Sequence, residues 1–253
     1  MGSSARRTRT SSSASCLNER IAAMMQTRPP SWEEEPILFW QSAPEKPTGI
    51  LDGMYDTDGV YGALADPKPL RAGGFHFAVL RDRPWTEAGA LTVGEPRRAV
   101  RVDTDGTVTA AALANNAMLG WGMDQATSSD GRNRLNVIAL TEMTLEYFRL
   151  VDEHVMPRAE GAWRHRILAR RFQEPSVVKL GEGGNPTWVM TGRVHEASAQ
   201  EWDKSWVAIG DAERDAYEAL KQLYALFGVS VKKNPFIADE RVDAAALLAA
   251  ASR

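Results

Sequence analysis

The sequence predicts an α+β fold with an antiparallel, β-rich N-terminal half, a long central amphipathic helix, a second small β block and C-terminal helices. Three observations support this class: a hairpin signature near residue 105, an apolar helical register over four turns from residue 135, and a second amphipathic helix after residue 211. Eight tryptophans and a 43% share of hydrophobic residues among 253 favour a globular protein with a real core.

The N-terminal segment is rich in Ser and Arg and lacks acidic residues. With almost no apolar side chain to bury, residues 1–15 are predicted to be a disordered tail, and an organelle transit peptide is the alternative interpretation. Residues 16–253 then form one α+β domain. The alternative division is two lobes, about 16–124 and 135–253, that share the long helix.

The N-terminal half contains the clearest local signal. Two alternating runs, Ala99–Asp103 and Thr107–Ala111, flank Asp105-Gly106, and glycine adopts the positive φ that such a turn requires. This pattern predicts an antiparallel hairpin. The other elements predicted here are a helix over 16–26, strands over 36–40, 75–80 and 118–121, and an irregular connection over 41–72 with one helical turn.

The C-terminal half is predicted to begin with a helix over Leu135–Met156, capped by Asn133 and closed by Pro157. Its polar stripe is expected to contain Glu142, Glu146, Arg149 and Glu153. Strands are predicted over 163–172, 177–180 and 187–191. A helix over 212–227, capped by Asp211 and ended by Gly228, and a short alanine-rich helix that starts at Asp239 complete the chain.

Several classes of function lack support in the sequence. The single cysteine, Cys16, indicates a reducing compartment, and no apolar run approaches the ~20 residues of a membrane helix, so a cytoplasmic location is expected. The glycine-rich stretch Lys179–Asn185 lacks the closing residues of a phosphate loop, and no Gly-x-Ser-x-Gly motif occurs. We expect no cofactor. No metal site is expected either, because local ligand spacing is absent among His76, His154, His165 and His195.

A basic strand is the best charge feature. Arg164, Arg166, Arg170 and Arg171 lie close together, and the first three share one strand face, which favours phosphate or nucleic-acid contact. The alternative is a solvated outer face whose arginines pair with nearby carboxylates.

The order of elements resembles a known family. It is similar to the region that follows the DNA-binding domain in bacterial Schlafen AlbA-type proteins. The stretches that resemble it are Leu70–Phe77, Arg97–Leu113, Leu135–Met156 and Trp163–Phe172. The AlbA-type domain itself has no match, so the resemblance implies an accessory region and does not carry DNA binding with it.

We therefore expect a non-catalytic binding or sensor module of a bacterial multi-component system, with protein partners and no membrane association. One alternative is a nucleic-acid-binding protein that uses the Arg164–Arg171 strand. Another is an enzyme of unfamiliar family whose acidic groups come from Asp52, Asp56 and Glu33–Glu35. No catalytic residue can be assigned from the sequence.

Overall fold

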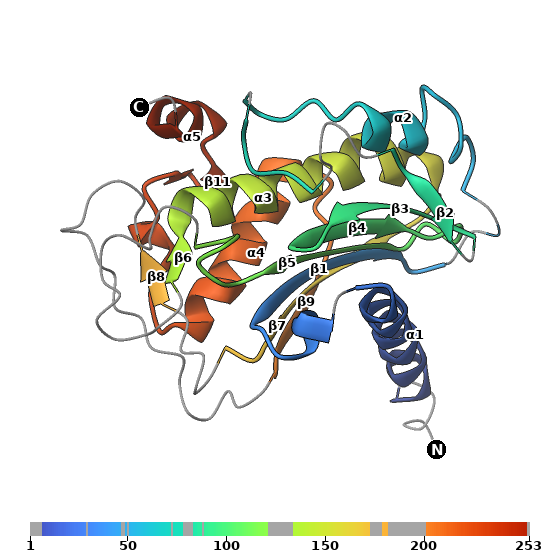
Figure 1. The fold of residues 1–253 in the computed structure, drawn as a ribbon, viewed down its shortest axis with the longest axis horizontal. Helices are drawn as coiled ribbons and strands as arrows, with labels where there is room; N and C mark the ends of the chain where they lie inside the picture. The colour runs from blue at the N-terminus through green and yellow to red at the C-terminus, as the bar shows by residue number, and fades with distance from the viewer. Residues whose placement is uncertain are drawn as a thin grey trace, which may run out of the picture.

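The structure is a computed structural model that describes residues 7–28, 30–46, 49, 51–71, 73–77, 83–87, 89–120, 134–172, 179–181 and 201–251. Its centre is a seven-stranded sheet, with helices packed on both faces (Figure 1). The predicted α+β class is confirmed. The hydrogen-bonded strand order is β2 (Trp85–Glu87), β3 (Ala90–Glu95), β4 (Arg98–Val102), β5 (Val108–Leu113), β1 (Ile37–Pro44), β7 (Trp163–Arg170) and β9 (Glu201–Val207).

All neighbours in this sheet are antiparallel. The predicted hairpin is confirmed as β4–β5, with Val102 opposite Val108 and Gly106 at a φ of +88° in the turn. Strand β1 lies between β5 and β7, and therefore joins strands from both halves of the chain. Two smaller sheets pair β6 (Arg134–Asn136) with β8 (Lys179–Gly181) in parallel, and β10 (Ile237–Ala238) with β11 (Arg241–Val242).

The long helix α3 (Val137–Leu150) covers one face of the sheet (Figure 1). The indole of Trp40 on β1 donates to Thr144 Oγ1 on α3 at 3.2 Å. The cap of α3 is Asn136, whose side chain accepts from the backbone N–H groups of Ile138 and Ala139. The predicted cap, Asn133, lies outside the described residues. The predicted helix continues past Leu150 as a π-turn, η4 (Val151–Val155), and a 3-10 turn, η5 (Met156–Arg158), which contains Pro157.

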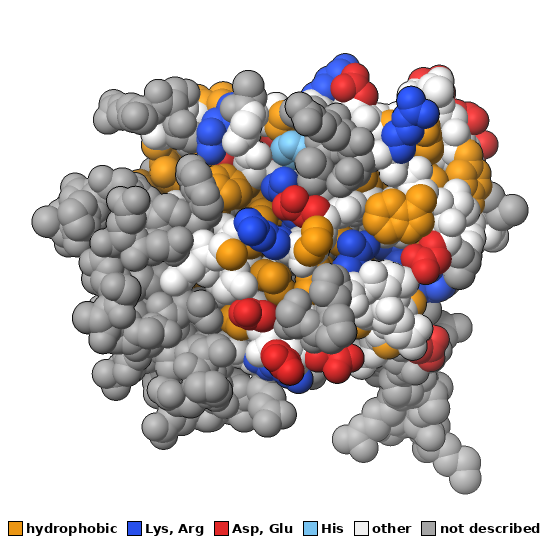
Figure 2. All heavy atoms as spheres, viewed as in Figure 1, with side chains coloured by type: hydrophobic (Ala, Val, Ile, Leu, Met, Phe, Trp, Pro, Cys, Tyr) orange, Lys and Arg blue, Asp and Glu red, His pale blue; other side chains and the backbone are white. Residues whose placement is uncertain are grey.

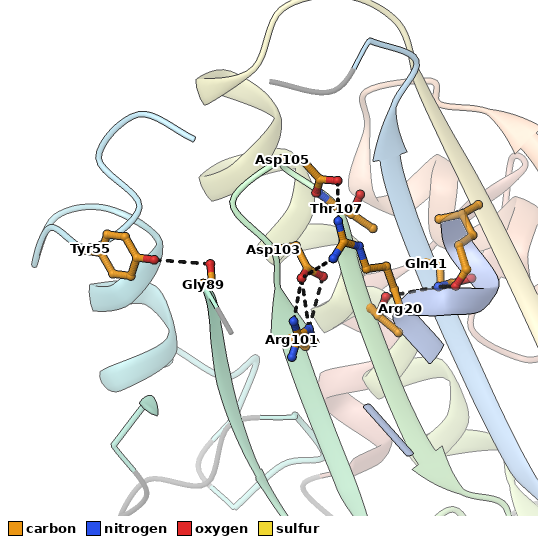
Figure 3. A network of polar contacts seen from close by, with 10 residues as sticks. Arg20, Gln41, Tyr55, Gly89, Arg101, Asp103, Asp105 and Thr107 are labelled. Carbon is orange, nitrogen blue, oxygen red and sulfur yellow. Dashed lines mark hydrogen bonds and ion pairs between the residues drawn. The ribbon is translucent and has the colours of Figure 1, made fainter. Parts of the chain in front are cut away.

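Helix α1 (Arg7–Gln26) covers the opposite face. Gln41, the neighbour of Trp40 on β1, points the other way because successive strand residues alternate, and its amide donates to Leu17 O of α1 at 2.9 Å. Arg20 of α1 also reaches the β4–β5 turn, where it lies 3.2 Å from Asp103 and 3.0 Å from Asp105 (Figure 3). Polar bonds therefore supplement the burial of α1.

The C-terminal elements pack beside α3. Helix α4 (Ala212–Leu226) is capped by Asp211, which accepts from Arg214 N, and Gly228 follows it at a φ of +66°, as the sequence predicts. Helix α5 (Ala244–Ala251) starts later than predicted, because Asp239 lies in the turn between β10 and β11, and Asp243 accepts from Ala246 N at the helix start. The remaining short elements are η1 (Pro30–Glu33), α2 (Val60–Ala65) and η6 (Val231–Lys233).

Several predicted boundaries were wrong. Helix α1 begins at Arg7 rather than at Cys16, because elongating a helix whose C-terminal part is formed requires no new nucleation step. Phe75–Phe77 is irregular, and so is 118–120. Phe77 instead packs its ring edge-to-face on Trp40, with centroids 5.3 Å apart. The expected strand over 187–191 lies outside the described residues. None of the described helices combines the length and apolar composition that a membrane span requires.

Candidate functional site

A cavity of about 440 Å³ opens between α2, the end of α3 and the β4 strand. Its walls come from segments that are distant in sequence: residues of the α2 region between 57 and 68, His76 and Phe77, Val100 of β4, and the residues Glu146, Arg149, Leu150, Glu153 and His154 at the end of α3 and on η4. Part of the lining is apolar and includes Leu64, Phe77, Val100 and Leu150. The charged and titratable residues in the lining are Asp58, Asp66, Lys68, His76, Glu146, Arg149, Glu153 and His154. Such a mixture of apolar wall and convergent polar groups is typical of small-molecule sites.

Glu146 is the main acid–base group of this cavity. Burial raises the pKa of its carboxyl to about 7, against the lowering effects of the Leu70 backbone N–H and of Arg149, while Glu142 and Glu153 raise it further. The Leu70 N–H donates to Oε1, so Oε2 remains for a ligand. A carboxyl with a pKa near 7 can both accept and release a proton at neutral pH, which suits general acid–base catalysis.

His76 supplies a neutral imidazole to the same cavity. Its side chain is buried, and burial together with the charge of Arg98 lowers its pKa to about 4. Among the described residues its Nδ1 has no hydrogen-bond partner. Buried polar atoms are nearly always paired, so this ring nitrogen is a candidate contact for a bound ligand.

The second cavity histidine, His154, lies on η4 at the rim and is half-buried. Burial lowers its pKa, and Glu153 works against that effect. Four carboxylates and two cations line the cavity when Glu146 is ionised, since the acids are Asp58, Asp66, Glu146 and Glu153 and the cations are Lys68 and Arg149. This excess of acid favours a cationic ligand such as an amine.

The described stretches 66–71 and 73–77, which we call the strap, lie against α3, and two carboxylates of this helix bind them. Glu142 lies 3.1 Å from Arg71, and Glu146 accepts from the Leu70 backbone. A Cβ at Gly74 would overlap with Glu142 Oε1, so any other residue there would displace the Glu142 carboxylate. The sequence predicts a polar stripe on this helix that contains Glu142 and Glu146. Glu142 is nevertheless fully buried, because the strap covers it.

The four arginines predicted for anion contact do not form one exposed face. Arg166 is buried under α1, where it donates to Asp203, Gln41 and Asn18. Arg164 is exposed and pairs with Glu45 at 3.1 Å, and Arg170 is half-buried over the ring of Phe39. Arg171 is exposed beyond the strand. On the face drawn in Figure 2, acidic and basic side chains are interspersed among hydrophobic ones.

The acidic residues suggested for an unfamiliar enzyme do not converge. Glu35 accepts from Asn115, just beyond the C-terminal end of β5. Leu51, next to Asp52, donates instead to Thr104 at the β4–β5 turn, which is the opposite end of that hairpin. Asp52, Asp56, Glu33 and Glu34 are exposed. The site residues that matter, Glu146 and His76, were missed because nothing local in the sequence indicates that the strap covers α3.

A second polar cluster lies behind α3. Ser42 Oγ is 2.7 Å from His165 Nδ1, and His165 Nε2 is 3.5 Å from Asp215 Oδ2. This is the order of a Ser-His-Asp triad, but Ser42 is fully buried and also accepts from Tyr147 OH at 2.8 Å, so no substrate reaches it. Asp152 completes the cluster. The fold therefore brings together a histidine and two carboxylates, which are possible metal ligands, although their spacing in the sequence gave no sign of it. His195 lies outside the described residues.

Comparison with known proteins finds one informative relative. It is a GCN5-like protein acetyltransferase of Mycobacterium tuberculosis, 30% identical over 104 residues. The alignment covers 37% of this chain, and the chain spans about half the length of that relative. No protein-family model matches the chain, and no solved structure matches it significantly.

Proposed function

We propose that the protein is an acyltransferase that acylates a small or peptide-borne amine in the cavity, with Glu146 as the general base. The observation that carries the proposal is the carboxylate of Glu146, which faces the cavity and has a pKa of about 7. The partial similarity to an acetyltransferase supports the same reaction class. The excess of carboxylates in the lining favours a substrate that arrives as an ammonium ion.

The reaction takes place between this amine and an acyl thioester. Glu146 removes one proton from the ammonium group, and the free amine nitrogen then attacks the thioester carbonyl carbon. A C–N bond forms and the C–S bond breaks. The second proton leaves the amine nitrogen and protonates the departing thiolate, and Glu146 returns its proton to solvent. His76, neutral and with an unpaired Nδ1, positions the amine through a hydrogen bond.

The test is thiol release from acetyl-CoA in the presence of spermidine or a lysine-containing peptide. The wild-type rate should rise with pH through about 7, and Glu146→Gln should lower kcat by about 100-fold or more without unfolding the protein. Glu160→Gln removes an exposed carboxylate outside the cavity and serves as the matched control. Equal rates for Glu146→Gln and wild type, or no amine-dependent thiol release by the wild type, would contradict the proposal.

The non-catalytic binding module suggested by the sequence is the second candidate for this cavity. The unpaired Nδ1 of His76 and the acidic lining suit retention of a cation as well as its conversion. Calorimetric titration with spermidine separates the two candidates, because saturable binding without thiol release supports the module.

A further inference from the structure

The second polar cluster joins three separate elements by groups that can ligate a metal. Asp152 comes from the π-turn η4, His165 from the middle of β7, and Asp215 from the first turn of α4. One ligand atom of each lies within 4.8 Å of the others. We propose that Asp152, His165 and Asp215 form a binding site for one first-row divalent cation, Zn²⁺ in the first instance, which fastens the end of α3 to β7 and α4.

The surroundings of His165 accommodate the tautomer that a metal needs. Its side chain is fully buried, and its Nδ1 lies 2.7 Å from Ser42 Oγ, which also accepts from Tyr147 OH. With the proton on Nδ1 directed at Ser42, the lone pair of Nε2 points into the cluster. Among the described residues, Nε2 faces Asp215 Oδ2 at 3.5 Å and makes no hydrogen bond of ordinary geometry. Metal-bound histidines characteristically donate their other ring N–H to such a partner.

The separation of Nε2 from Asp215 Oδ2 fits a shared metal better than a direct hydrogen bond. It is 3.5 Å, longer than an ordinary N–H···O bond of about 2.9 Å. Two ligand atoms bound at about 2.0–2.2 Å with tetrahedral angles lie about 3.3–3.6 Å apart. His165 and Asp215 therefore already stand at the spacing of two zinc ligands.

The carboxylate of Asp215 is oriented by its own surroundings. It accepts from the Trp206 indole at 3.1 Å and from the backbone N–H groups of Ile209 and Gly210, each at 3.0 Å. Hydrogen bonds of this kind fix ligating carboxylates in known metal sites. They hold Oδ2 toward His165 whether or not an ion is bound.

Asp152 supplies the third ligand and the second negative charge. Both of its carboxylate oxygens are buried and, among the described residues, have no hydrogen-bond partner. In the same part of the chain, no lysine or arginine pairs with Asp152 or Asp215. A divalent cation between the two carboxylates would neutralise both charges. The π-turn, a feature frequent at functional sites, is the local distortion that carries Asp152.

The ligand set selects the class of ion. An imidazole with two carboxylates suits Zn²⁺ and its first-row neighbours, whereas Ca²⁺ and Mg²⁺ prefer oxygen ligands alone. The cation is assigned a structural role here and is separate from the reaction proposed for the cavity.

The experiment uses the full chain, stripped with EDTA and titrated with Zn²⁺ or Co²⁺. We expect one equivalent to bind, the Tm to rise by several degrees, and Co²⁺ to give visible absorption bands of a low-symmetry site. Asp152→Asn should abolish all three effects. The metal-free variant should remain folded, because the change removes a negative charge next to Asp215 and keeps the shape of the side chain.

Glu160→Gln is the control, since it removes an exposed carboxylate that is not one of the three proposed ligands and should bind metal like the wild type. Two outcomes overturn the proposal: no stoichiometric binding by the wild type, or binding that Asp152→Asn leaves unchanged. Neither depends on acyl transfer, so the cation site and the proposed reaction stand or fall separately.

Discussion

The guanidinium of Arg71 lies 3.1 Å from the carboxylate of Glu142, a fully buried side chain of α3. Burial raises the pKa of Glu142, and Arg71 is the first influence that opposes it, followed by the Phe75 backbone N–H. The ion pair therefore stabilises the ionised form of Glu142 beneath the strap. The strap itself forms one side of the cavity.

Replacing Arg71 should destabilise the protein by leaving that carboxylate without its cation. For Arg71→Met we expect a loss of about 1–3 kcal/mol in the free energy of unfolding, measured by urea denaturation. Arg71→Met combined with Glu142→Gln should recover part of the loss. Arg214→Met, on an exposed arginine side chain, should change stability by less than about 0.5 kcal/mol. A single variant as stable as the control would show that the pair does not hold the strap.

The raised pKa of Glu146 predicts a pH dependence of stability. Its folded-state pKa of about 7 exceeds the ordinary value of 4.5, so its contribution is fully present below pH 4.5 and is lost as the pH rises through 7. Glu146→Gln keeps an oxygen for the Leu70 N–H and cannot ionise. The stability of this variant relative to wild type should therefore increase between pH 5 and 8. A difference that stays constant across this range would contradict the assignment.

His76 should give the stability of the protein the opposite pH dependence. Its folded-state pKa of about 4 lies below 6.5, so its contribution is present above pH 6.5 and is lost as the pH falls through 4. His76→Gln should make unfolding less sensitive to acid in that window. The ring should also stay neutral at pH 5 in an NMR titration. A ring that charges above pH 6 would show that the imidazole is solvated.

Phe148 is a core residue at which α3 meets the sheet. Its ring lies 5.0 Å from Tyr147 and 4.9 Å from the His165 ring, measured between centroids. Phe148→Ala should cost about 3–5 kcal/mol in urea unfolding. Glu153→Ala, at an exposed position on η4, should cost no more than about 0.5 kcal/mol. Equal losses of unfolding free energy for the two variants would show that Phe148 is not part of the core.

Arg166 and Arg164 share one face of β7 but differ in their surroundings. Arg166→Met should cost about 1–3 kcal/mol, because it leaves the buried amide oxygen of Gln41 without its donor beneath α1. Arg164→Met removes only an exposed pair with Glu45 and should be nearly neutral. The nucleic-acid alternative stays a prediction; it requires affinity for single-stranded DNA that falls steeply with salt and is weakened by Arg164→Met.

The elements predicted correctly are those whose signals are complete within the element. The β4–β5 hairpin has its Asp-Gly turn between two alternating runs, and α4 has Asp211 and Gly228 at its ends. The prediction of a strand was wrong for Phe75–Phe77. Alternating aromatic residues also occur in an irregular segment that buries one ring, as Phe77 does against Trp40. The resemblance to Schlafen AlbA-type accessory regions stays a prediction.

The candidate site could not be predicted, because each of its key residues depends on a partner far along the chain. From the sequence alone, Glu146 is interpreted as an acidic residue on the polar side of a helix. In the structure it is covered by the strap, which lies about 70 positions earlier in the chain. From the sequence alone, His165 is interpreted as an ordinary core histidine. In the structure, Asp152 and Asp215 from two other elements lie next to it. Only tertiary contacts define these environments, and periodicity contains no information about them.

The central place of β1 has a consequence for synthesis on the ribosome. One edge of this strand is paired by β5, but the other has to wait for β7, whose first residue is Trp163. At about 5–20 residues per second, the chain between Pro44 and Trp163 takes on the order of 10 s to emerge. Throughout that interval a strand of mostly apolar residues presents open hydrogen-bonding groups. The nascent protein should therefore depend on holdase chaperones until its second half has been made.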